Sequence, residues 1–471
     1  MYHILLSDIC YTNTMNSKLT FYTGVGTVTG ANFLLDTGSV RIMVDCGMVQ
    51  GERVAQEMNY EAFAYNPASV DILLITHAHL DHVGRIPKLV KDGFKGVIYS
   101  TPQTRELAQV VLEDAVNILR QEAEQHDLSP LYDEADVASI FPLWKTIPYH
   151  ENYEIAQSVS VFLKDAGHIL GSSMFEISYE GKKILFTGDV GNSPAPLLRD
   201  TESIGDVDYI ITESVYGDRN HEPRELRREQ LERVINETMK RGGTLVIPAF
   251  SIDRTQVLLY ELNNLVDQKK IPSVPVFLDS PMGEKATRIY QDNTDLFNKE
   301  AIAQIQGGDD LFAFPHLTFV TTNRESQSID SIAGAKIILA GSGMSIGGRV
   351  ISHERRFLGD PNSTILLVGY QSAGSLGREL ADGNKNVSIH GEKIKVRAHI
   401  ETLYGYSAHK DSDHLVQFVA TAGDTKGGKG KLKTVFVAMG EFKSSTFLAQ
   451  RLNNELGIKA VVPERGEGYE I

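Results

Sequence analysis

The fold of this chain is decided by one short stretch, Thr76-His77-Ala78-His79-Leu80-Asp81-His82. It places four good metal ligands, three imidazoles and a carboxylate, within six positions. The run Val70–Ile75 before it is short, mostly apolar and rich in β-branched residues, which is typical of a buried strand. The residues after it, Val83–Val90, turn towards helical spacing. We therefore expect the ligands on the loop that leaves the carboxyl end of a strand.

The spacing of these ligands predicts two neighbouring metal sites. In an extended loop His77, His79 and Asp81 share one side because side chains alternate, whereas His82, at the turn into the helix, can reach a second centre. Imidazole and carboxylate together suit zinc, and two ligand sets this close indicate two zinc ions with a bridging water. Histidines also cap helices and line cores, but a chance cluster of this density is a poor explanation.

Length and composition indicate a soluble globular enzyme of two to three domains. The chain has 471 residues, of which 42% are hydrophobic and 23% charged, and no apolar run approaches the ~20 residues of a membrane span. Residues 1–17 carry no pattern and no secretory signal, and we expect them to be an extension of the folded chain. With only Cys10 and Cys46, nothing predicts a disulfide framework, so a reducing cytoplasm is expected.

The net charge of −15 argues against broad electrostatic attraction to nucleic acid, because phosphate contacts usually come from an excess of Lys and Arg. A locally positive channel is still compatible with it, and bound zinc adds charge that the count omits. Basic side chains gather at Arg224–Arg233, Arg355–Arg356 and Lys426–Lys433, but such clusters are more often solvated faces than binding patches.

Further candidate ligands stand at the ends of other apolar strands. A hairpin over 31–44 ends at Asp45, which we expect to orient a ligand histidine, although an Asp before Gly is often only a turn residue. His168 lies between glycines after an apolar strand, and Asp189 ends the strand that begins at Lys183. A lone histidine is usually a satisfied core or loop residue, but together these side chains complete a plausible ligand set.

Between these ligands, helical spacing predicts an amphipathic helix over 104–125 and a second helical stretch over 130–144. After residue 213 strands and helices alternate, which predicts a parallel sheet with covering helices. Two glycine-rich loops, 341–349 and 369–378, follow strands of this sheet. Their backbone amides can cradle phosphate, but turn formation alone would also explain the glycines.

The ordered set of His77, His79, Asp81, His82, His168 and Asp189 resembles the metallo-β-lactamase superfamily. Later landmarks resemble the β-CASP nucleases, which include the endonuclease subunit of the cleavage and polyadenylation specificity factor. The resemblance runs from about Lys18 to the end of the chain. Its later landmarks are Glu213, Arg254-Thr255-Gln256, Ser342-Gly343-Met344, Gly347-Gly348-Arg349, Gly369-Tyr370-Gln371 and Ser407-Ala408-His409.

The resemblance implies an α/β protein with an αββα metallo-β-lactamase domain that an α/β β-CASP domain with a mostly parallel sheet interrupts. The first part would span 18–213, the inserted domain 214–390 and the completing part 391–471. It also implies two zinc ions, phosphodiester cleavage and a substrate channel between the domains. By the same resemblance His77, His79 and His168 hold one zinc, Asp81 and His82 hold the other, and Asp189 bridges them. The residues that it implies to be catalytic are Asp81, Glu213 and His409. Those that it implies to contact substrate are Ser342, Arg349 and Ser407.

The residues fit this chemistry in their own right. Phosphodiester hydrolysis needs a nucleophile at neutral pH, neutralisation of charge on the phosphoryl oxygens and a proton for the leaving oxygen. Two zinc ions meet the first two needs, and we expect His409 to meet the third. Glu213 would then fix the tautomer of His409 and raise its pKa.

Three rival functions remain open from the sequence. The ligand set alone does not exclude a small-molecule metallo-hydrolase such as a lactonase, although the large inserted domain argues against one. A DNA nuclease of the same family is the second rival. A non-catalytic subunit of a processing complex is the third, and the retention of all six early ligands speaks against it. We favour endonucleolytic cleavage of single-stranded RNA by a cytoplasmic protein that forms a homodimer.

Met439 is the one departure from the RNA-cleaving pattern, in which a histidine before Gly-Glu completes the second zinc site. A thioether is a poor zinc ligand, so we expect the second zinc to bind more weakly than the first. His414 is a weak candidate to replace the missing ligand, because it falls on the helix that follows His409.

Overall fold

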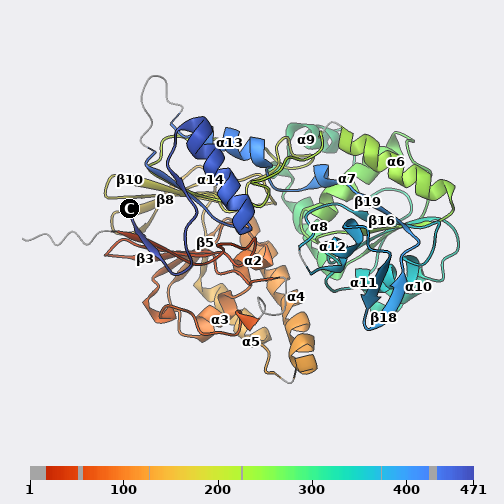
Figure 1. Cartoon of the computed structure of the whole chain (residues 1–471), viewed down its shortest axis with the longest axis horizontal. Helices are drawn as coiled ribbons and strands as arrows, with labels where there is room; N and C mark the ends of the chain where they lie inside the picture. The colour runs from red at the N-terminus through yellow and green to blue at the C-terminus, as the bar shows by residue number, and fades with distance from the viewer. Residues whose placement is uncertain (1–16, 51–56, 127, 224–225, 373, 424–431) are drawn as a thin grey trace, which may run out of the picture.

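The protein is described from a computed structural model, over residues 17–50, 57–126, 128–223, 226–372, 374–423 and 432–471. The expected extension, up to residue 16, and most of the basic stretch at 426–433 lie outside these residues. The chain forms two lobes, and a single inserted segment makes up almost all of the second lobe, on the right of Figure 1. Across the described residues, no helix combines the length and the apolar character needed to cross a membrane.

The first lobe contains two seven-stranded mixed sheets, in the orders β22-β1-β2-β3-β4-β5-β6 and β21-β20-β11-β10-β9-β8-β7. The predicted hairpin is confirmed, since β2 and β3 pair antiparallel. The strands of the first sheet are β1 (Lys18–Thr23), β2 (Asn32–Asp36), β3 (Arg41–Val44), β4 (Ile72–Leu74), β5 (Val97–Ser100), β6 (Trp144–Thr146) and β22 (Gly468–Glu470). Those of the second are β7 (Asn152–Ala156), β8 (Val159–Asp165), β9 (Ser173–Tyr179), β10 (Lys182–Phe186), β11 (Tyr209–Thr212), β20 (Thr434–Val437) and β21 (Ala460–Val461).

Apolar side chains from the facing sides of these two sheets form one shared core, in which Phe21 and Phe33 meet Phe175 and Phe436. Helices cover both outer faces, so the lobe has the expected αββα layers. The helices on the first sheet are α2 (Leu80–Val83), α3 (Ile86–Lys91), α4 (Pro102–His126) and α5 (Glu134–Ile140), and those on the second are α13 (Ser412–Ala420) and α14 (Phe442–Leu456).

The helical prediction for this lobe was right over α4 and partly wrong beyond it. The stretch expected to be helical over 130–144 keeps only α5 and a short 3₁₀ turn, and Trp144 begins strand β6. Trp144 pairs with Ile98 across the sheet, and its indole N–H donates to the Ser100 hydroxyl at 2.8 Å. These tertiary contacts outweigh the local helical pattern.

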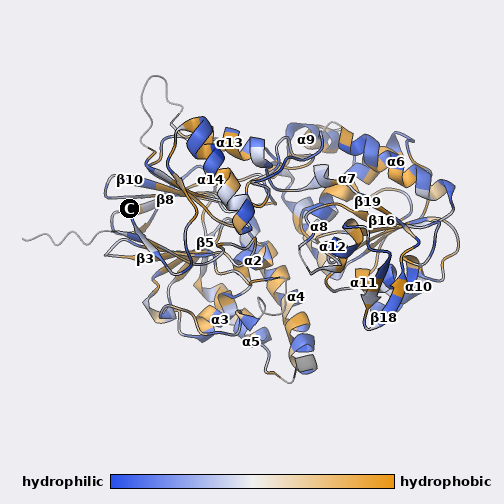
Figure 2. Cartoon of the chain, in the orientation of Figure 1, coloured by the Kyte–Doolittle hydropathy of each residue, from blue (hydrophilic) through white to orange (hydrophobic). Residues whose placement is uncertain are grey.

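The second lobe is a six-stranded sheet in the order β14-β13-β15-β12-β16-β19, and every pair in it is parallel. Helices cover both faces, and their mixed polar and apolar surfaces are visible in Figure 2. The strands are β12 (Thr244–Pro248), β13 (Val276–Asp279), β14 (Leu317–Phe319), β15 (Lys336–Ala340), β16 (Thr364–Leu367) and β19 (His399–Thr402), and a hairpin of β17 (Asn386–Ile389) and β18 (Glu392–Lys395) lies beside them. The helices are α6 (Arg227–Lys240), α7 (Arg254–Asp267), α8 (Pro281–Asp292), α9 (Lys299–Gln306), α10 (Asn323–Ile329), α11 (Val350–Phe357) and α12 (Leu376–Ala381).

The inserted sheet extends past residue 390, where the sequence places the end of the inserted domain. Strand β19 follows that point, yet it pairs in parallel with β16 along the edge of the inserted sheet. Its sequence, His399-Ile400-Glu401-Thr402, has too few apolar residues to reveal which sheet it joins. We therefore propose that the inserted domain ends near Thr402.

A buried carboxyl group in the inserted lobe predicts a dependence of stability on pH. Glu354 on α11 is fully buried, and one of its oxygens accepts the Ser345 hydroxyl at 2.5 Å. Burial raises the pKa of Glu354 from 4.5 to about 8, against the smaller opposing effect of that hydrogen bond. Because the pKa is higher in the folded state, the stabilising contribution of the proton is complete below pH 4.5 and is lost as the pH rises through 8.

We expect the free energy of unfolding to include a component that falls by about 1 kcal/mol per pH unit between pH 5 and pH 8. Glu354→Gln, which mimics the neutral acid, should remove that component and be the more stable protein at pH 8. Chemical denaturation of both proteins across this range measures the difference. Equal slopes for the two proteins would show that Glu354 is ionised in the fold.

Candidate metal centre

The histidine cluster lies on the loop between β4 and α2, and Asp45 from the neighbouring strand end fixes that loop. The Asp45 carboxylate accepts the backbone N–H and the hydroxyl of Thr76, both at 2.8 Å. Asp45 has a φ of 58°, which is uncommon for a residue with a side chain and is found often at functional sites. Next to it, a Cβ on Gly47 would lie 1.5 Å from the carbonyl oxygen of Asp81, so only glycine fits there.

Three imidazoles from two separate loops converge on one point. His79 Nδ1 lies 3.2 Å from His77 Nε2 and 3.2 Å from His168 Nε2. One carboxylate oxygen of Asp189, Oδ2, lies 3.5 Å from each of these two Nε2 atoms. A tetrahedral zinc with bonds of 2.0–2.1 Å requires ligand atoms about 3.4 Å apart, and these four distances of 3.2 and 3.5 Å are close to that spacing.

A second group of possible ligands adjoins the first and shares Asp189 with it. The other oxygen of Asp189, Oδ1, lies 3.5 Å from His82 Nε2, and Asp81 Oδ2 lies 3.8 Å from the same nitrogen. Both Asp189 Oδ1 and His82 Nε2 are buried without a hydrogen-bond partner among the described residues. Each oxygen of Asp189 thus faces a different group, which is the arrangement of a carboxylate that bridges two metal ions.

Hydrogen bonds on the far side of the rings fix which nitrogen faces the centre. His82 Nδ1 lies 2.7 Å from the Asp45 carboxylate, and His168 Nδ1 lies 3.2 Å from the carbonyl oxygen of Ala408. Each Nδ1–H can donate to its oxygen acceptor, which leaves the Nε2 lone pair free for a metal. The position expected for Asp45 is therefore the one observed. The Ala408 carbonyl has no side-chain signature in the sequence and was not predicted.

The environment keeps the first group of imidazoles neutral. Burial, aided by neighbouring imidazoles, holds the pKa of His77 and of His168 well below the ordinary value. Burial likewise lowers the pKa of His79 to about 3. Neutral imidazoles with buried lone pairs are the form that binds a metal ion.

His409 and Glu213 form a pair beside the same bridging carboxylate. His409 Nδ1 lies 3.1 Å from both carboxylate oxygens of Glu213 and 3.9 Å from Asp189 Oδ2. Glu213 is buried and also accepts the N–H of Val190 at 2.7 Å. Burial lowers the pKa of His409, but the carboxylates of Glu213, Asp189 and Asp81 together outweigh it, Glu213 most strongly, and raise this pKa to about 9. The predicted pairing of Glu213 with His409 is therefore present in the geometry.

Met439 lies beside the second group but packs into the core. It is 3% exposed, and its sulfur lies 2.8 Å from where a Cβ on Gly24 would be. It also lines a small cavity together with Asp45 and His82. His414 belongs to no group of possible ligands among the described residues, and its Nδ1 contacts the Asp411 carboxylate at 2.5 Å.

The three predicted substrate contacts differ in their surroundings. Ser407 lines a cavity between the lobes, and its hydroxyl accepts the backbone N–H of His409 at 3.3 Å. Ser342 lies in the glycine-rich loop after β15, where its hydroxyl accepts the N–H of Ile346. Arg349 is held inside the inserted lobe by Asp279 at 2.7 Å and by two backbone carbonyls, which favours a structural role.

The cavity between the lobes also contains residues that the sequence did not identify as part of a site. Arg227 and Arg254 reach it from the inserted lobe and face His168 and Asn192 of the first lobe. The Oδ1 atom of Asn192 is buried without a hydrogen-bond partner in the described part of the chain. Arg254 belongs to Arg254-Thr255-Gln256, a landmark of the family resemblance, and that landmark could have identified it as a candidate site residue.

Comparisons with known proteins agree with this geometry. Family models match at residues 34–211 (Metallo-beta-lactamase superfamily domain), 255–380 (Beta-Casp domain) and 393–463 (Zn-dependent metallo-hydrolase RNA specificity domain). Ribonuclease TTHA0252 of Thermus thermophilus is 35% identical over 83% of this chain and 88% of its own length. The chain belongs to the β-CASP family of the metallo-β-lactamase superfamily. Its class is therefore that of a metal-dependent hydrolase.

Other members of this family are similar over most of the chain. An RNase J-like protein of Methanocaldococcus jannaschii is 30% identical over 92% of this chain and 94% of its own length. The transcription termination factor FttA of Methanosarcina mazei is 31% identical over 91% of this chain and 67% of its own length. A crystal structure of a protein of unknown function from Enterococcus faecalis shares the fold across 97% of this chain, with a TM-score of 0.54 and 13% identity.

Proposed function

We propose that this chain is a zinc-dependent ribonuclease that hydrolyses phosphodiester bonds within single-stranded RNA. The observation that carries the proposal is the position of Asp189, which two ligand groups share and which the His409–Glu213 pair adjoins. Relatives named as ribonucleases and the match to an RNA specificity domain support RNA as the substrate. The cavity between the lobes, with arginines on its inserted side, supports a polyanionic ligand.

The donor atoms fit zinc in type and in spacing. His77, His79 and His168 would hold one ion, Asp81 and His82 the other, and Asp189 both. Zinc, when bound, supplies positive charge to the phosphoryl oxygens and lowers the pKa of a water molecule. Asp45 orients the imidazole of His82 toward the second site through its hydrogen bond to His82 Nδ1.

We assign His409 as the residue that donates a proton to the leaving group. Its Nδ1–H is held by Glu213, so the opposite ring nitrogen, Nε2, is the one left to give a proton to the leaving oxygen. Glu213 is a positioning residue that orients the ring and stabilises its charged form. Ser407, whose hydroxyl accepts the backbone N–H of His409, holds the backbone of this loop beside the cavity between the lobes.

The test is incubation of zinc-loaded protein with 5′-labelled and internally labelled single-stranded RNA and DNA, with and without a chelator. We expect chelator-sensitive internal fragments from RNA with 5′-phosphate and 3′-hydroxyl ends. Stepwise release of nucleotides from the 5′ end would identify an exonuclease, and preferential cleavage of DNA would identify a DNA nuclease. Efficient hydrolysis of thioesters or lactones with RNA left intact would overturn the proposal. Cell fractionation and light scattering test the further proposals of a cytoplasmic location and a homodimer.

The second zinc is predicted to be the weaker of the two. Only Asp81, His82 and the shared Asp189 are available to it among the described residues, because Met439 packs into the core. Mild chelation followed by metal analysis should leave about one zinc per chain. Met439→His should raise the occupancy of the second site, since residue 439 lines the same cavity as His82. Two equally retained ions in the unmutated protein, with no gain from the histidine, would contradict this prediction.

A further inference from the structure

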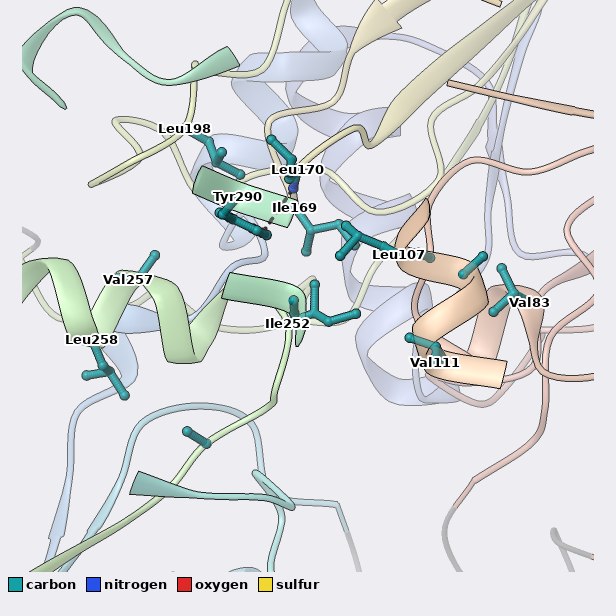
Figure 3. Close-up of a cluster of buried hydrophobic side chains, with 14 of the residues drawn as sticks. Val83, Leu107, Val111, Ile169, Leu170, Leu198, Ile252, Val257, Leu258 and Tyr290 are labelled. Atoms are coloured by element: carbon teal, nitrogen blue, oxygen red, sulfur yellow. Dashed lines mark hydrogen bonds between the residues drawn. The ribbon is translucent and has the colours of Figure 1, made fainter. Parts of the chain in front are cut away.

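A single buried hydroxyl group joins the loop that carries His168 to the inserted lobe. Tyr290 on α8 is fully buried, and its oxygen accepts the backbone N–H of Leu170 at 3.1 Å. The same oxygen lies 3.3 Å from Asp253 Oδ1, to which its proton is donated. Figure 3 draws this hydrogen bond as a dashed line between Tyr290 and the backbone nitrogen of Leu170.

We call the two hydrogen bonds of the Tyr290 hydroxyl, to Leu170 and to Asp253, the Tyr290 relay. Each end of this relay lies next to a residue of the candidate site. Leu170 follows the predicted zinc ligand His168 by two positions. Asp253 precedes Arg254, and the two side chains form an ion pair at 3.8 Å. Arg254 lines the cavity between the lobes together with His168. The hydroxyl thus connects a ligand loop of one lobe to a buried cation of the other.

The hydroxyl of Tyr290 and the Leu170 N–H lie among buried apolar side chains. Ile169, Leu170 and Ile252 are at most 4% exposed, and apolar side chains of α4 and α7 close the cluster (Figure 3). If the hydroxyl is removed, the buried Leu170 N–H loses its hydrogen-bond partner in an apolar setting. The loop that carries His168 must then shift or keep an unsatisfied donor.

We propose that Tyr290 is a positioning residue, whose hydroxyl holds the loop of His168 and the start of α7 in one fixed relation. The inference rests on the proposed function, because it assumes that His168 binds zinc and that Arg254 faces the substrate. A displacement of about 1 Å at a reacting centre reduces rates by about 10²-fold, and partners outside the ligand shell alter metal affinity by about 10- to 100-fold. Tyr290 affects both the reaction rate and the zinc affinity through the Leu170 N–H and the Asp253 carboxylate, which it contacts directly.

The experiment compares Tyr290→Phe with Tyr132→Phe in the full chain. Tyr132 is equally buried, and its hydroxyl has no hydrogen-bond partner among the described residues, so it controls for the loss of a buried hydroxyl. Zinc retention during chelator titration is measured first, and kcat and KM for RNA second. We expect Tyr290→Phe to lose the zinc of its first site at a chelator concentration about tenfold lower than the unmutated protein does. We also expect its kcat to be about 10- to 100-fold lower. Tyr132→Phe should stay within about twofold of the unmutated protein in both.

A double-mutant cycle with Asp253→Asn provides the second test. If the relay acts as a unit, the loss of zinc affinity in the double variant will be smaller than the sum of the two single losses. Zinc retention in Tyr290→Phe equal to that in Tyr132→Phe would overturn the inference, whatever the effect on melting temperature. Zinc retention is measured without RNA, so this result is independent of the proposed substrate. Absence of RNA cleavage by the unmutated, zinc-loaded protein would instead overturn the proposed function.

Discussion

Replacing Asp189 by alanine is expected to empty both metal groups together and to reduce RNA cleavage to the level seen in excess chelator. One oxygen of this carboxylate lies 3.5 Å from ligand nitrogens of His77 and His168, and the other lies 3.5 Å from His82 Nε2. Removing it leaves three neutral imidazoles in the first group and only Asp81 and His82 in the second. Metal analysis after gel filtration measures the loss directly.

Asp208→Ala is the matched control for the loss of a buried carboxylate. Asp208 is 7% exposed, accepts the N–H of Lys183 at 2.9 Å and belongs to no ligand group in the described chain. It should keep its zinc and its activity, even if its stability falls. An Asp189→Ala protein that retained two zinc ions would show that the two groups do not share this carboxylate.

The sequence predicted that these candidate ligands lie together, because its signal is local. His77 to His82 lie within six positions, and the apolar strand before them fixes where the loop emerges. His168 and Asp189 follow β8 and β10 of the second sheet, whereas His77 to His82 follow β4 of the first, and the ends of these strands converge on the centre. Residue type and strand position together were enough to assemble the ligand set, and the family resemblance supplied the pairing of Glu213 with His409.

What the sequence did not predict depends on contacts between distant segments. The Ala408 carbonyl orients His168 through a backbone atom, which any residue could supply. Tyr290 and Asp253 stand 37 positions apart and meet only because α8 and the start of α7 pack together. Strand β19 joins the inserted sheet through pairing with β16, although its four residues carry no strong strand pattern. Such features follow from tertiary packing, which local periodicity does not encode.

Replacing His409 by alanine is expected to lower RNA cleavage by about 10²- to 10⁴-fold while both zinc ions are retained. The reason is the orientation of the ring, since its Nδ1 is occupied by Glu213 and lies 3.9 Å from the nearest oxygen of Asp189. Single-turnover kinetics and metal analysis of the same preparation separate the two effects. Glu213→Gln should give a smaller loss, because it leaves the ring in place but weakens the bond that orients it.

His414→Ala is the matched control for this prediction. His414 lies on α13, and its side chain is 39% exposed and contacts Asp411, away from the ligand groups found among the described residues. Its removal should leave cleavage and zinc content unchanged. His409 also falls within 4.8 Å of Asp189 and Glu213 in a third group of possible ligands, so metal content decides its role. Loss of one zinc in His409→Ala would make His409 a ligand rather than the proton donor, whereas retained zinc with lost cleavage assigns it to the leaving group.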